Sequence, residues 1–285
     1  MFNQRKFVKV LLYLAMVLVA IAIFAPFYWL IISSVSTMSE LLCTPPHWIP
    51  KHPTFDNYLN IFFPKTGVAR AAKIFMYTVR NSLIIAGGVT IISLILGSLA
   101  AYAFVRLVFP MRKQILISIL ATRMLPAIST MIPLYIIVTK FNLIDTKISL
   151  IILYFTFTIP YVIWIMTGFF RTIPSELEDA ARIDGCSRLG SFLRVILPLS
   201  TPGLIATTVI AFMLAWDEFF FALIFTNTPN AKTVPVAITE FAGRHLIDYG
   251  GMCTGGVLAS IPPVLLALIF YRFIVRGLTA GAVKG

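Results

Sequence analysis

The sequence predicts an all-α integral membrane protein with six membrane-spanning helices and a charged, cytoplasmic helical loop between the fourth and fifth spans. Its mean hydropathy is +0.93. Of its 285 residues, 59% are hydrophobic and only 12% are charged, a balance outside the range of soluble globular proteins. The apolar residues form six segments long enough to cross a bilayer, which takes about 20 residues. We expect one membrane domain over residues 1–285, because the sequence shows neither an internal repeat nor a soluble domain.

Six apolar segments lie between the charged residues of the chain, at about 10–33, 82–105, 114–139, 148–170, 199–225 and 252–271. The first is longer than the roughly 7 to 15 apolar residues of a signal peptide and has no small-residue cleavage site, so we expect an uncleaved anchor. The longest connection, about 34–80, should lie at the outer surface. Its first half should be extended, because prolines prevent helix formation there. Those prolines are Pro45, Pro46, Pro50 and Pro53.

Positive charges are concentrated in the short segments on one side of the six spans. Those segments hold Arg5, Lys6, Lys9, Arg106, Arg112, Lys113, Arg171, Arg182, Arg188, Arg194, Arg272, Arg276 and Lys284, or 13 of the 23 Lys and Arg residues. Short cytoplasmic segments are enriched in Lys and Arg, so we expect both termini and the loop after the fourth span in the cytoplasm. Topology and lipid contact then explain the net charge of +12, and nothing in the sequence indicates a nucleic-acid partner.

Cysteine and histidine are too few and too scattered to indicate a disulfide framework or a metal site. The three cysteines are Cys43, Cys186 and Cys253, and the three histidines are His47, His52 and His245. None of them has a neighbour at metal-ligand spacing. We expect structural cysteines and no metal, with a bridge between Cys43 and Cys253 as the minor alternative.

The connection between the fourth and fifth spans, about 172–198, is a charged segment between two apolar runs. Ser175 and Glu178 have the spacing of a reciprocal capping box, and the acidic residues of this turn suit the positive end of a helix. Gly185 is placed to end that helix in a left-handed conformation, and Ser187 begins a second short helix. The segment is therefore predicted to form a helix, a turn and a second helix.

One face of the first predicted helix carries small residues. Leu177, Ala180, Ala181 and Asp184 recur at spacings of three and four, and the alanines allow a partner surface to approach closely. We interpret this face as a docking surface. The alternative is a solvated hairpin that only joins two spans.

The same loop carries a motif with defined spacing. Asp179, Ala180 and Ala181 are followed after three residues by Gly185, and after nine more by Val195-Ile196-Leu197-Pro198. This spacing resembles the coupling-loop motif of ABC importer permeases, in which a glutamate usually stands at the position of Asp179. The resemblance implies docking on an ATPase. It assigns that role to Glu178, Asp179, Ala180, Ala181, Asp184, Gly185, Leu197 and Pro198.

Further segments resemble the carbohydrate-type ABC importer permeases, in particular the G-type subunits of maltose transporters. They are Phe55-Asp56-Asn57-Tyr58, Arg123-Met124-Leu125-Pro126, Ile132-Pro133-Leu134-Tyr135, Ala215-Trp216-Asp217-Glu218-Phe219 and the last nine residues from Gly277. The resemblance to these permeases extends over most of the chain. One departure from the pattern is Asp217, where the family commonly has asparagine.

The resemblance implies a subunit of an ATP-driven importer for a carbohydrate, which would be an oligosaccharide, a polyol or a sugar phosphate, in the cytoplasmic (inner) membrane of a prokaryote. The other parts would be a second homologous permease, a dimer of cytoplasmic ABC ATPases and an extracytoplasmic solute-binding protein. The chain contains no Walker A segment ending in Gly-Lys-Ser or Gly-Lys-Thr. We therefore expect a transporter subunit without enzymatic activity or cofactor of its own, with ATP and Mg²⁺ bound by the separate ATPase.

The resemblance also implies two contacts outside the coupling loop. The cytoplasmic tail, about 272–285, is expected to enter the interface between the two ATPases. Its candidate residues are Gly277, Thr279, Val283 and Lys284. The last outer loop, about 226–252, is expected to reach the binding protein, with a plain connector as the alternative. Its candidate residues are Arg244, His245, Asp248 and Tyr249.

Three ionisable residues lie inside predicted spans, where each costs about 2.5 to 3.5 kcal/mol on insertion scales. They are Arg123, Asp217 and Glu218. One interpretation is a substrate path in which these groups bind sugar hydroxyls while nearby aromatic residues stack on sugar rings. Those aromatic residues are Trp216, Phe219 and Phe220, which share a face at helical spacing. The interpretation that we favour is an ion pair of Arg123 with Asp217 or Glu218 that fixes two helices.

An ion-coupled secondary transporter that uses the same three charges is the alternative function. The coupling-loop motif argues against it, because a secondary transporter has no ATPase to dock. A membrane-embedded enzyme is disfavoured as well. The sequence offers no buried Ser and His pair, no paired aspartates and no metal cluster.

Overall fold

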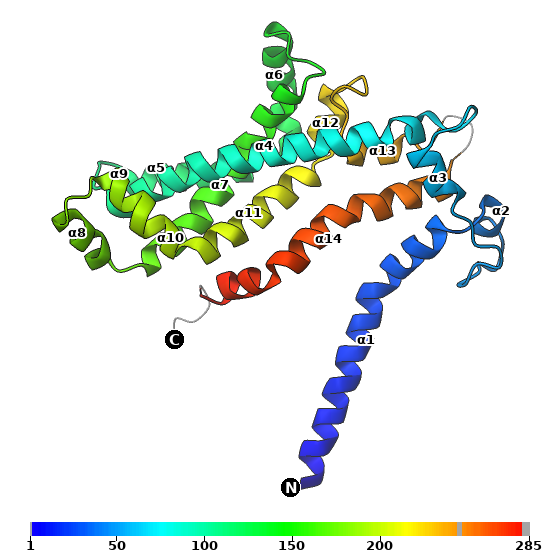
Figure 1. Ribbon diagram of the computed structural model, residues 1–285, viewed down its shortest axis with the longest axis horizontal. Coiled ribbons are helices and arrows are strands. Elements are labelled where there is room, and N and C mark those ends of the chain that lie inside the picture. Colours follow the sequence, from blue (N-terminus) through cyan, green and yellow to red (C-terminus); the bar gives the residue numbers. More distant parts are fainter. Residues whose placement is uncertain (1, 244–246, 281–285) are drawn as a thin grey trace. The chain divides into compact units, whose positions relative to one another are not determined.

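The computed structural model describes residues 2–243 and 247–280, and in these two ranges the chain is helical without any strand. The prediction of an all-α protein is therefore confirmed (Figure 1). Two compact units form within the chain: one comprises residues 1–76 and 237–260, and the other comprises residues 77–236 and 261–285. The prediction of one membrane domain stays a prediction.

The first unit gathers three helices at the backbone of Ser34, the last residue of α1 (Phe2–Ser34). The amide of Asn57, in α3 (Asp56–Phe62), donates to the Ser34 carbonyl over 3.0 Å, and the hydroxyl of Thr254, in α14 (Tyr249–Ala280), donates to it over 3.2 Å. The hydroxyls of Ser34 and Tyr58 lie 2.8 Å apart. These bonds satisfy carbonyls that the end of a helix leaves without an internal partner.

The proline-rich connection after α1 is mostly irregular, as predicted, apart from the short helix α2 (Met38–Leu41). Glu40 organises it by accepting hydrogen bonds from the backbone amides of Lys51 (2.8 Å) and His52 (2.9 Å). The connection is shorter than the expected 34–80, because α4 (Arg70–Arg106) begins at Arg70. The prediction counted apolar segments, and such a segment ends at the charged residues near the start of α4. The helix itself can continue beyond the membrane, so it is longer than the apolar segment.

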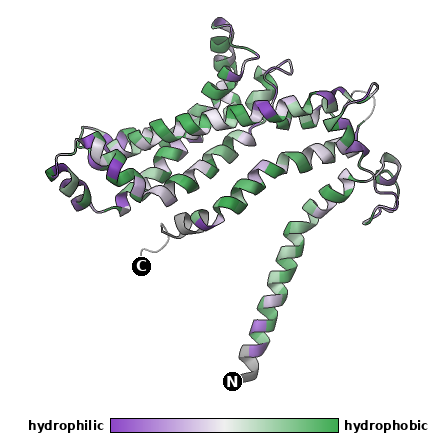
Figure 2. Cartoon of the chain, in the orientation of Figure 1, coloured by the Kyte–Doolittle hydropathy of each residue, from purple (hydrophilic) through white to green (hydrophobic). Residues whose placement is uncertain are grey.

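Within residues 2–243 and 247–280, four helices are long and apolar enough to cross a membrane: α1, α4, α7 (Lys147–Thr172) and α14. Figure 2 shows hydrophobic residues along most of the length of α1. Its apolar window is not buried within the chain, which suits a helix in contact with lipid or with another subunit. The count rises to six if each of two bent helix pairs is one span.

The predicted third span is one of these bent pairs. It comprises α5 (Arg112–Ala121), the 3₁₀ turn η1 (Thr122–Met124) and α6 (Ala127–Lys140), with a bend of 96°. Pro126, the residue before α6, has an extended backbone, and its ring disfavours a helical conformation at the residue before it. The apolar segment predicted at 114–139 is therefore two helices joined at Pro126.

The predicted fifth span is also interrupted. Residues 188–199 form α9 (Arg188–Ser191), the π-helical turn η2 (Phe192–Ile196) and α10 (Leu197–Leu199), and this segment meets α11 (Thr201–Trp216) at 80°. The short helices α12 (Phe220–Phe225) and α13 (Val234–Thr239) follow. Between α11 and α12 the backbone of residues 217–219 is not helical.

Helices α4, α7 and α11 pack closely in the second unit, because glycine lets their backbones approach. A Cβ atom at Gly97 of α4 would lie 2.6 Å from the Val162 side chain of α7, and one at Gly203 of α11 would lie 2.4 Å from Phe169. At these distances a residue larger than glycine would not fit unless the neighbouring helix moved. These contacts set the frame that holds both sites described below.

Asp145 ties the connection between α6 and α7 to the segment after α12. Its carboxylate accepts hydrogen bonds from the Thr228 hydroxyl and from the amides of Asn227 (2.9 Å) and Thr228 (3.0 Å). Partial burial by itself raises the pKa of Asp145, but these bonds, with a contribution from the charge of Lys232, bring the pKa below its usual value. The carboxylate thus stays ionised and holds the two connections together.

Candidate functional site

The loop between α7 and α11 folds as the predicted helix, turn and second helix. Helix α8 (Ser175–Ile183) is followed by Asp184 and then by Gly185, whose φ of 89° is in the left-handed region that only glycine adopts without cost. Two hydrogen bonds close this turn: Gly185 N to the carbonyl of Arg182 (3.1 Å) and Cys186 N to the carbonyl of Ala181 (3.0 Å). Ser187 caps α9 by accepting a hydrogen bond from Gly190 N. This is the Schellman arrangement followed directly by a new helix.

The capping box predicted for the first helix does not form. Ser175 is the first residue of α8, the preceding position is occupied by Pro174, and no side chain caps the helix. Pro174 has a backbone conformation outside the helical region, so the helix starts one residue earlier than the capping box requires. Glu178, the other half of the predicted box, is engaged elsewhere.

Glu178 is buried and fastens α8 to the end of α4. Its Oε2 lies 3.2 Å from Nε of Arg106, as an ion pair without the alignment of a hydrogen bond. Its Oε1 accepts a hydrogen bond from the hydroxyl of Tyr102. Arg106 also donates to the carbonyl of Ile173 over 2.7 Å, at the end of α7. One guanidinium thus connects α4, α7 and α8.

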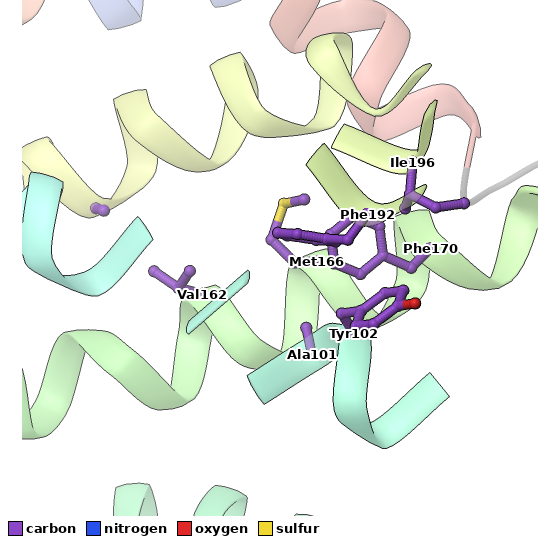
Figure 3. Packing of buried hydrophobic residues seen from close by; sticks show 8 residues of the cluster. Ala101, Tyr102, Val162, Met166, Phe170, Phe192 and Ile196 are labelled. Atoms are coloured by element: carbon purple, nitrogen blue, oxygen red, sulfur yellow. The ribbon is translucent and has the colours of Figure 1, made fainter. Parts of the chain in front are cut away.

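An aromatic cluster lies beneath this ion pair. The ring of Tyr102 packs on Phe192 at 4.8 Å between centroids, and Phe170 meets Phe192 edge to face at 6.0 Å. Ile196 is fully buried in the same cluster. Figure 3 shows these side chains converging from α4, α7 and η2. The base of the loop is therefore held by packed side chains as well as by charge.

The opposite surface of the loop exposes large apolar side chains. Ile183 is 87% exposed, Leu189 57%, Leu193 50% and Leu177 44%. Of the eight residues that the resemblance assigns to docking, five are exposed, whereas Ala181 and Leu197 are half-buried and Glu178 is buried. The exposed five are Asp179, Ala180, Asp184, Gly185 and Pro198. Exposed leucine and isoleucine between charged residues are typical of a surface that a partner covers.

A second site is a cavity of about 780 Å³ at the bend between η1 and α6. The residues that line it are Thr122, Arg123, Leu125, Ala127, Ser129, Thr130, Pro133, Leu134, Thr156, Phe157, Glu218 and Phe221. Its volume lies within the range of about 300 to 1,000 Å³ that is usual for small-molecule sites. Its wall combines two charged residues, four hydroxyls and the stacked pair Phe157 and Phe221, whose centroids lie 5.8 Å apart.

Arg123 and Glu218 both face this cavity but do not pair with each other. The guanidinium of Arg123 donates to the carbonyl of Phe157 (3.0 Å) and to the hydroxyl of Tyr161 (3.1 Å), and it lies 4.4 Å from the Tyr161 ring centroid. The two oxygens of Glu218 accept hydrogen bonds from the amides of Phe221 (2.8 Å) and Ala222 (3.2 Å).

The ion pair that we favoured from the sequence, between Arg123 and Asp217 or Glu218, is therefore wrong within the described residues. The pair does not form because each residue has nearer partners. Glu218 accepts hydrogen bonds from the free amides of α12, and carbonyl and aromatic groups of α7 hold Arg123. Asp217 is exposed at the end of α11.

The chain matches the family described as "Binding-protein-dependent transport system inner membrane component" over residues 93–280. It belongs to this family. The match includes both the loop at 172–198 and the cavity, and the chain is therefore a multi-pass inner-membrane permease of an ABC import system.

Curated relatives of this permease align over nearly its whole length. It is 37% identical over 278 residues to the trehalose/maltose transport system permease protein MalG of Thermococcus litoralis, covering 97% of each chain. It is 40% identical over 239 residues to the trehalose transport system permease protein SugB of Mycobacterium tuberculosis, covering 83% of this chain and 84% of the relative.

The permease also has the fold of solved ABC transporters. A chain of a bacterial transporter that imports the acidic polysaccharide alginate superposes with a TM-score of 0.79 at 18% identity, covering 94% of this permease and 96% of that chain. A chain of the MetNI methionine transporter superposes with a TM-score of 0.53 at 16% identity, over 71% of this permease and 94% of that chain. At these identities the likeness concerns the fold alone.

The aromatic residues predicted to line a path in this permease are separated by the structure. Trp216 is buried at the end of α11 and stacks on Phe212, with centroids 5.6 Å apart. Phe219 lies in the irregular segment, and Phe220 begins α12. Because the helix stops after Trp216, the helical spacing that placed the three on one face does not apply. Phe157 and Phe221 line the cavity instead, and no pattern in the sequence pointed to either.

The remaining predicted contacts of the permease are only partly within the described residues. Gly277 and Thr279 belong to the last turns of α14, while Val283 and Lys284 lie outside the described residues, as do Arg244 and His245. Asp248 accepts a hydrogen bond from Gly251 N over 2.8 Å, and Tyr249 is the first residue of α14. Cys43, Cys186 and Cys253 are free thiols, so the bridge between Cys43 and Cys253 is not formed.

Proposed function

We propose that this permease forms half of the path of an ATP-driven importer for a carbohydrate. Its partners are a second homologous permease, a dimer of cytoplasmic ABC ATPases and an extracytoplasmic solute-binding protein. The observation that carries the proposal is the loop at 172–198. Its inner side is fixed to α4 and α7 by Arg106, and its outer side exposes apolar residues. A loop that is fixed to membrane helices on one side and exposes apolar residues on the other can bind a partner protein and transmit its movement to those helices.

The energy source in this proposal is ATP bound with Mg²⁺ on the partner ATPase. The sequence has no Walker A segment, so this chain contributes no phosphate-binding loop of that type. The exposed residues Ile183 and Leu189 contact the ATPase, and Asp179 and Asp184 supply charged contacts around them. Movement of the ATPases then displaces α8 together with α4.

A sugar is the favoured cargo because relatives at 37% and 40% identity transport trehalose or maltose, according to their names. The cavity at the bend between η1 and α6 is large enough for such a ligand and carries charged, hydroxyl and aromatic groups. Sugars use these groups through their hydroxyls and their apolar ring faces. In this proposal Arg123 and Glu218 line the path, Asp217 lies at its edge, and Phe157 and Phe221 provide the aromatic surface.

The termini complete the proposed arrangement. Both lie in the cytoplasm, where Lys and Arg are concentrated. The tail from Gly277, with Thr279, Val283 and Lys284, contacts the ATPase dimer. The loop before α14, with Arg244, His245, Asp248 and Tyr249, contacts the binding protein.

Reconstitution of the complete importer in liposomes tests this function against the alternative of ion-coupled transport. We expect labelled maltose or trehalose to accumulate only when ATP is inside the liposomes and the binding protein is outside. A liposome without an ion gradient should accumulate the sugar equally well. Uptake that persists without ATP and depends on a proton or sodium gradient would establish the secondary transporter instead.

A further inference from the structure

The cavity at the bend between η1 and α6 presents many hydrogen-bond acceptors and few donors. Each hydroxyl has one hydrogen to donate and two lone pairs that accept. The hydroxyl of Ser129 donates to the Pro126 carbonyl over 2.7 Å, and that of Thr130 donates to the Ala127 carbonyl over 2.9 Å. The only hydrogen of each hydroxyl is therefore used inside α6, and the oxygen remains able to accept.

Two more hydroxyls of the cavity behave in the same way. Thr122 donates to the carbonyl of Ile119 over 2.6 Å, and Thr156 donates to the carbonyl of Leu153 over 2.6 Å. Bonds of this kind are frequent for Ser and Thr in helices. Here their consequence is particular, because all four hydroxyls line one cavity.

Glu218 adds a fifth acceptor group. Its two oxygens accept hydrogen bonds from the backbone amides of Phe221 and Ala222, and a carboxylate has no hydrogen to donate. Among the described residues that line the cavity, Arg123 is the side chain with hydrogens left to donate. Two of its five N–H groups are used by the Phe157 carbonyl and the Tyr161 hydroxyl.

We propose that this cavity is a binding subsite for a neutral sugar, which it recognises mainly by accepting hydrogen bonds from the sugar's hydroxyl groups. The sugar donates to Thr122, Ser129, Thr130, Thr156 and Glu218, and it accepts from Arg123 at one position. This inference rests on the proposed carbohydrate transport and specifies which carbohydrates the permease itself favours.

Anionic sugars fit the same cavity poorly. A carboxylate, sulfonate or phosphate group brings oxygens without hydrogens, and those oxygens would face acceptors that cannot bond to them. Such a group is tolerated beside Arg123, but not at the other five positions. The subsite therefore discriminates against acidic sugars independently of the binding protein.

Protection of a cysteine inside the cavity tests this subsite. In the complete importer in detergent, the three free cysteines are changed to serine and Ala127→Cys places a reporter on the cavity wall. A neutral methanethiosulfonate reagent then modifies the reporter in the presence of glucose, glucuronate or glucosamine. Glucuronate and glucosamine each differ from glucose by one functional group. We expect glucose at about three times its Kd to slow modification about fourfold, and glucuronate at the same concentration to have no effect.

Two matched variants test whether protection of the reporter cysteine depends on the hydroxyl oxygens of the cavity. Thr130→Val with Thr156→Val removes two acceptor oxygens while nearly keeping side-chain shape, and it should weaken protection by glucose about tenfold. Thr139→Val removes an equivalent helix hydroxyl in α6 that lies outside the cavity, and it should leave protection unchanged. Ile136→Cys, exposed on the same helix, should not be protected in any case.

Three outcomes would overturn the subsite. They are equal protection by glucuronate, protection that the two valine substitutions leave intact, and absence of protection by glucose. Stronger protection by glucosamine would show an amine or cation site in its place. Because ATP-driven uptake in liposomes is measured separately, failure of the subsite with intact uptake leaves the transport function standing.

Discussion

Gly185→Val is expected to uncouple ATP hydrolysis from sugar uptake. At φ 89° a residue with a Cβ is strained by about 1 to 2 kcal/mol, and a β-branched residue by more. A Cβ at this position meets no atom within 4 Å, so the effect comes from the backbone alone. The turn that joins α8 to α9 should distort, and sugar-stimulated ATPase activity of the reconstituted importer should fall about tenfold.

Gly185→Asn is the control for this substitution. Asparagine tolerates the left-handed region better than other residues with a Cβ, so this variant should keep most of the sugar-stimulated ATPase activity. If Gly185→Val assembles and couples as well as the unmodified permease, the turn has no role in energy transfer.

Arg106→Met is expected to destabilise the permease strongly. It leaves Glu178 buried without its ionic partner, and breaking a buried pair in this way costs about 3 to 5 kcal/mol. It also removes the hydrogen bond to the carbonyl of Ile173. The midpoint of thermal unfolding of the purified permease complex, followed by size-exclusion chromatography after heating, should fall on the order of 10 °C.

The double variant Arg106→Met with Glu178→Gln separates charge from packing. Glutamine still accepts the hydrogen bond of Tyr102 but carries no charge, so the double variant should regain much of the lost stability. Arg112→Met removes an arginine that donates an exposed hydrogen bond to the carbonyl of Leu107, and this variant should unfold like the unmodified permease. If the double variant is no more stable than Arg106→Met, the unpaired charge of Glu178 is not what destabilises Arg106→Met.

Local patterns in the sequence predicted the helical fold and the shape of the coupling loop. Long apolar segments predict helices, because in lipid the polar groups of the backbone must form hydrogen bonds with one another. Gly185 and Ser187 were interpreted correctly because their roles depend only on neighbouring residues. The third span shows the limit of this approach. Its position follows from its apolar residues, but nothing in the sequence gives a bend of 96°.

Contacts between distant residues were not predictable from the sequence. Arg106 and Glu178 are 72 positions apart, and only the packing of α4 against the loop brings them together. Arg123 and Glu218 looked like an ion pair because buried opposite charges usually need one. Hydrogen bonds to backbone groups and an aromatic face satisfy them instead. The predicted docking face is exposed at Leu177, Ala180 and Asp184. The structure also exposes Ile183 and Leu189, which the prediction did not include.

Copurification of the ATPase with the permease tests the central claim that the loop at 172–198 docks on it. Ile183→Asp places a charge on a side chain that is 87% exposed at the loop surface. Phe63→Asp places the same charge on a side chain that is 72% exposed in the connection between α3 and α4. We predict that the unmodified permease and Phe63→Asp retain the ATPase, while Ile183→Asp loses at least about nine-tenths of it and remains folded. Retention of the ATPase by Ile183→Asp at the level of Phe63→Asp would contradict the account.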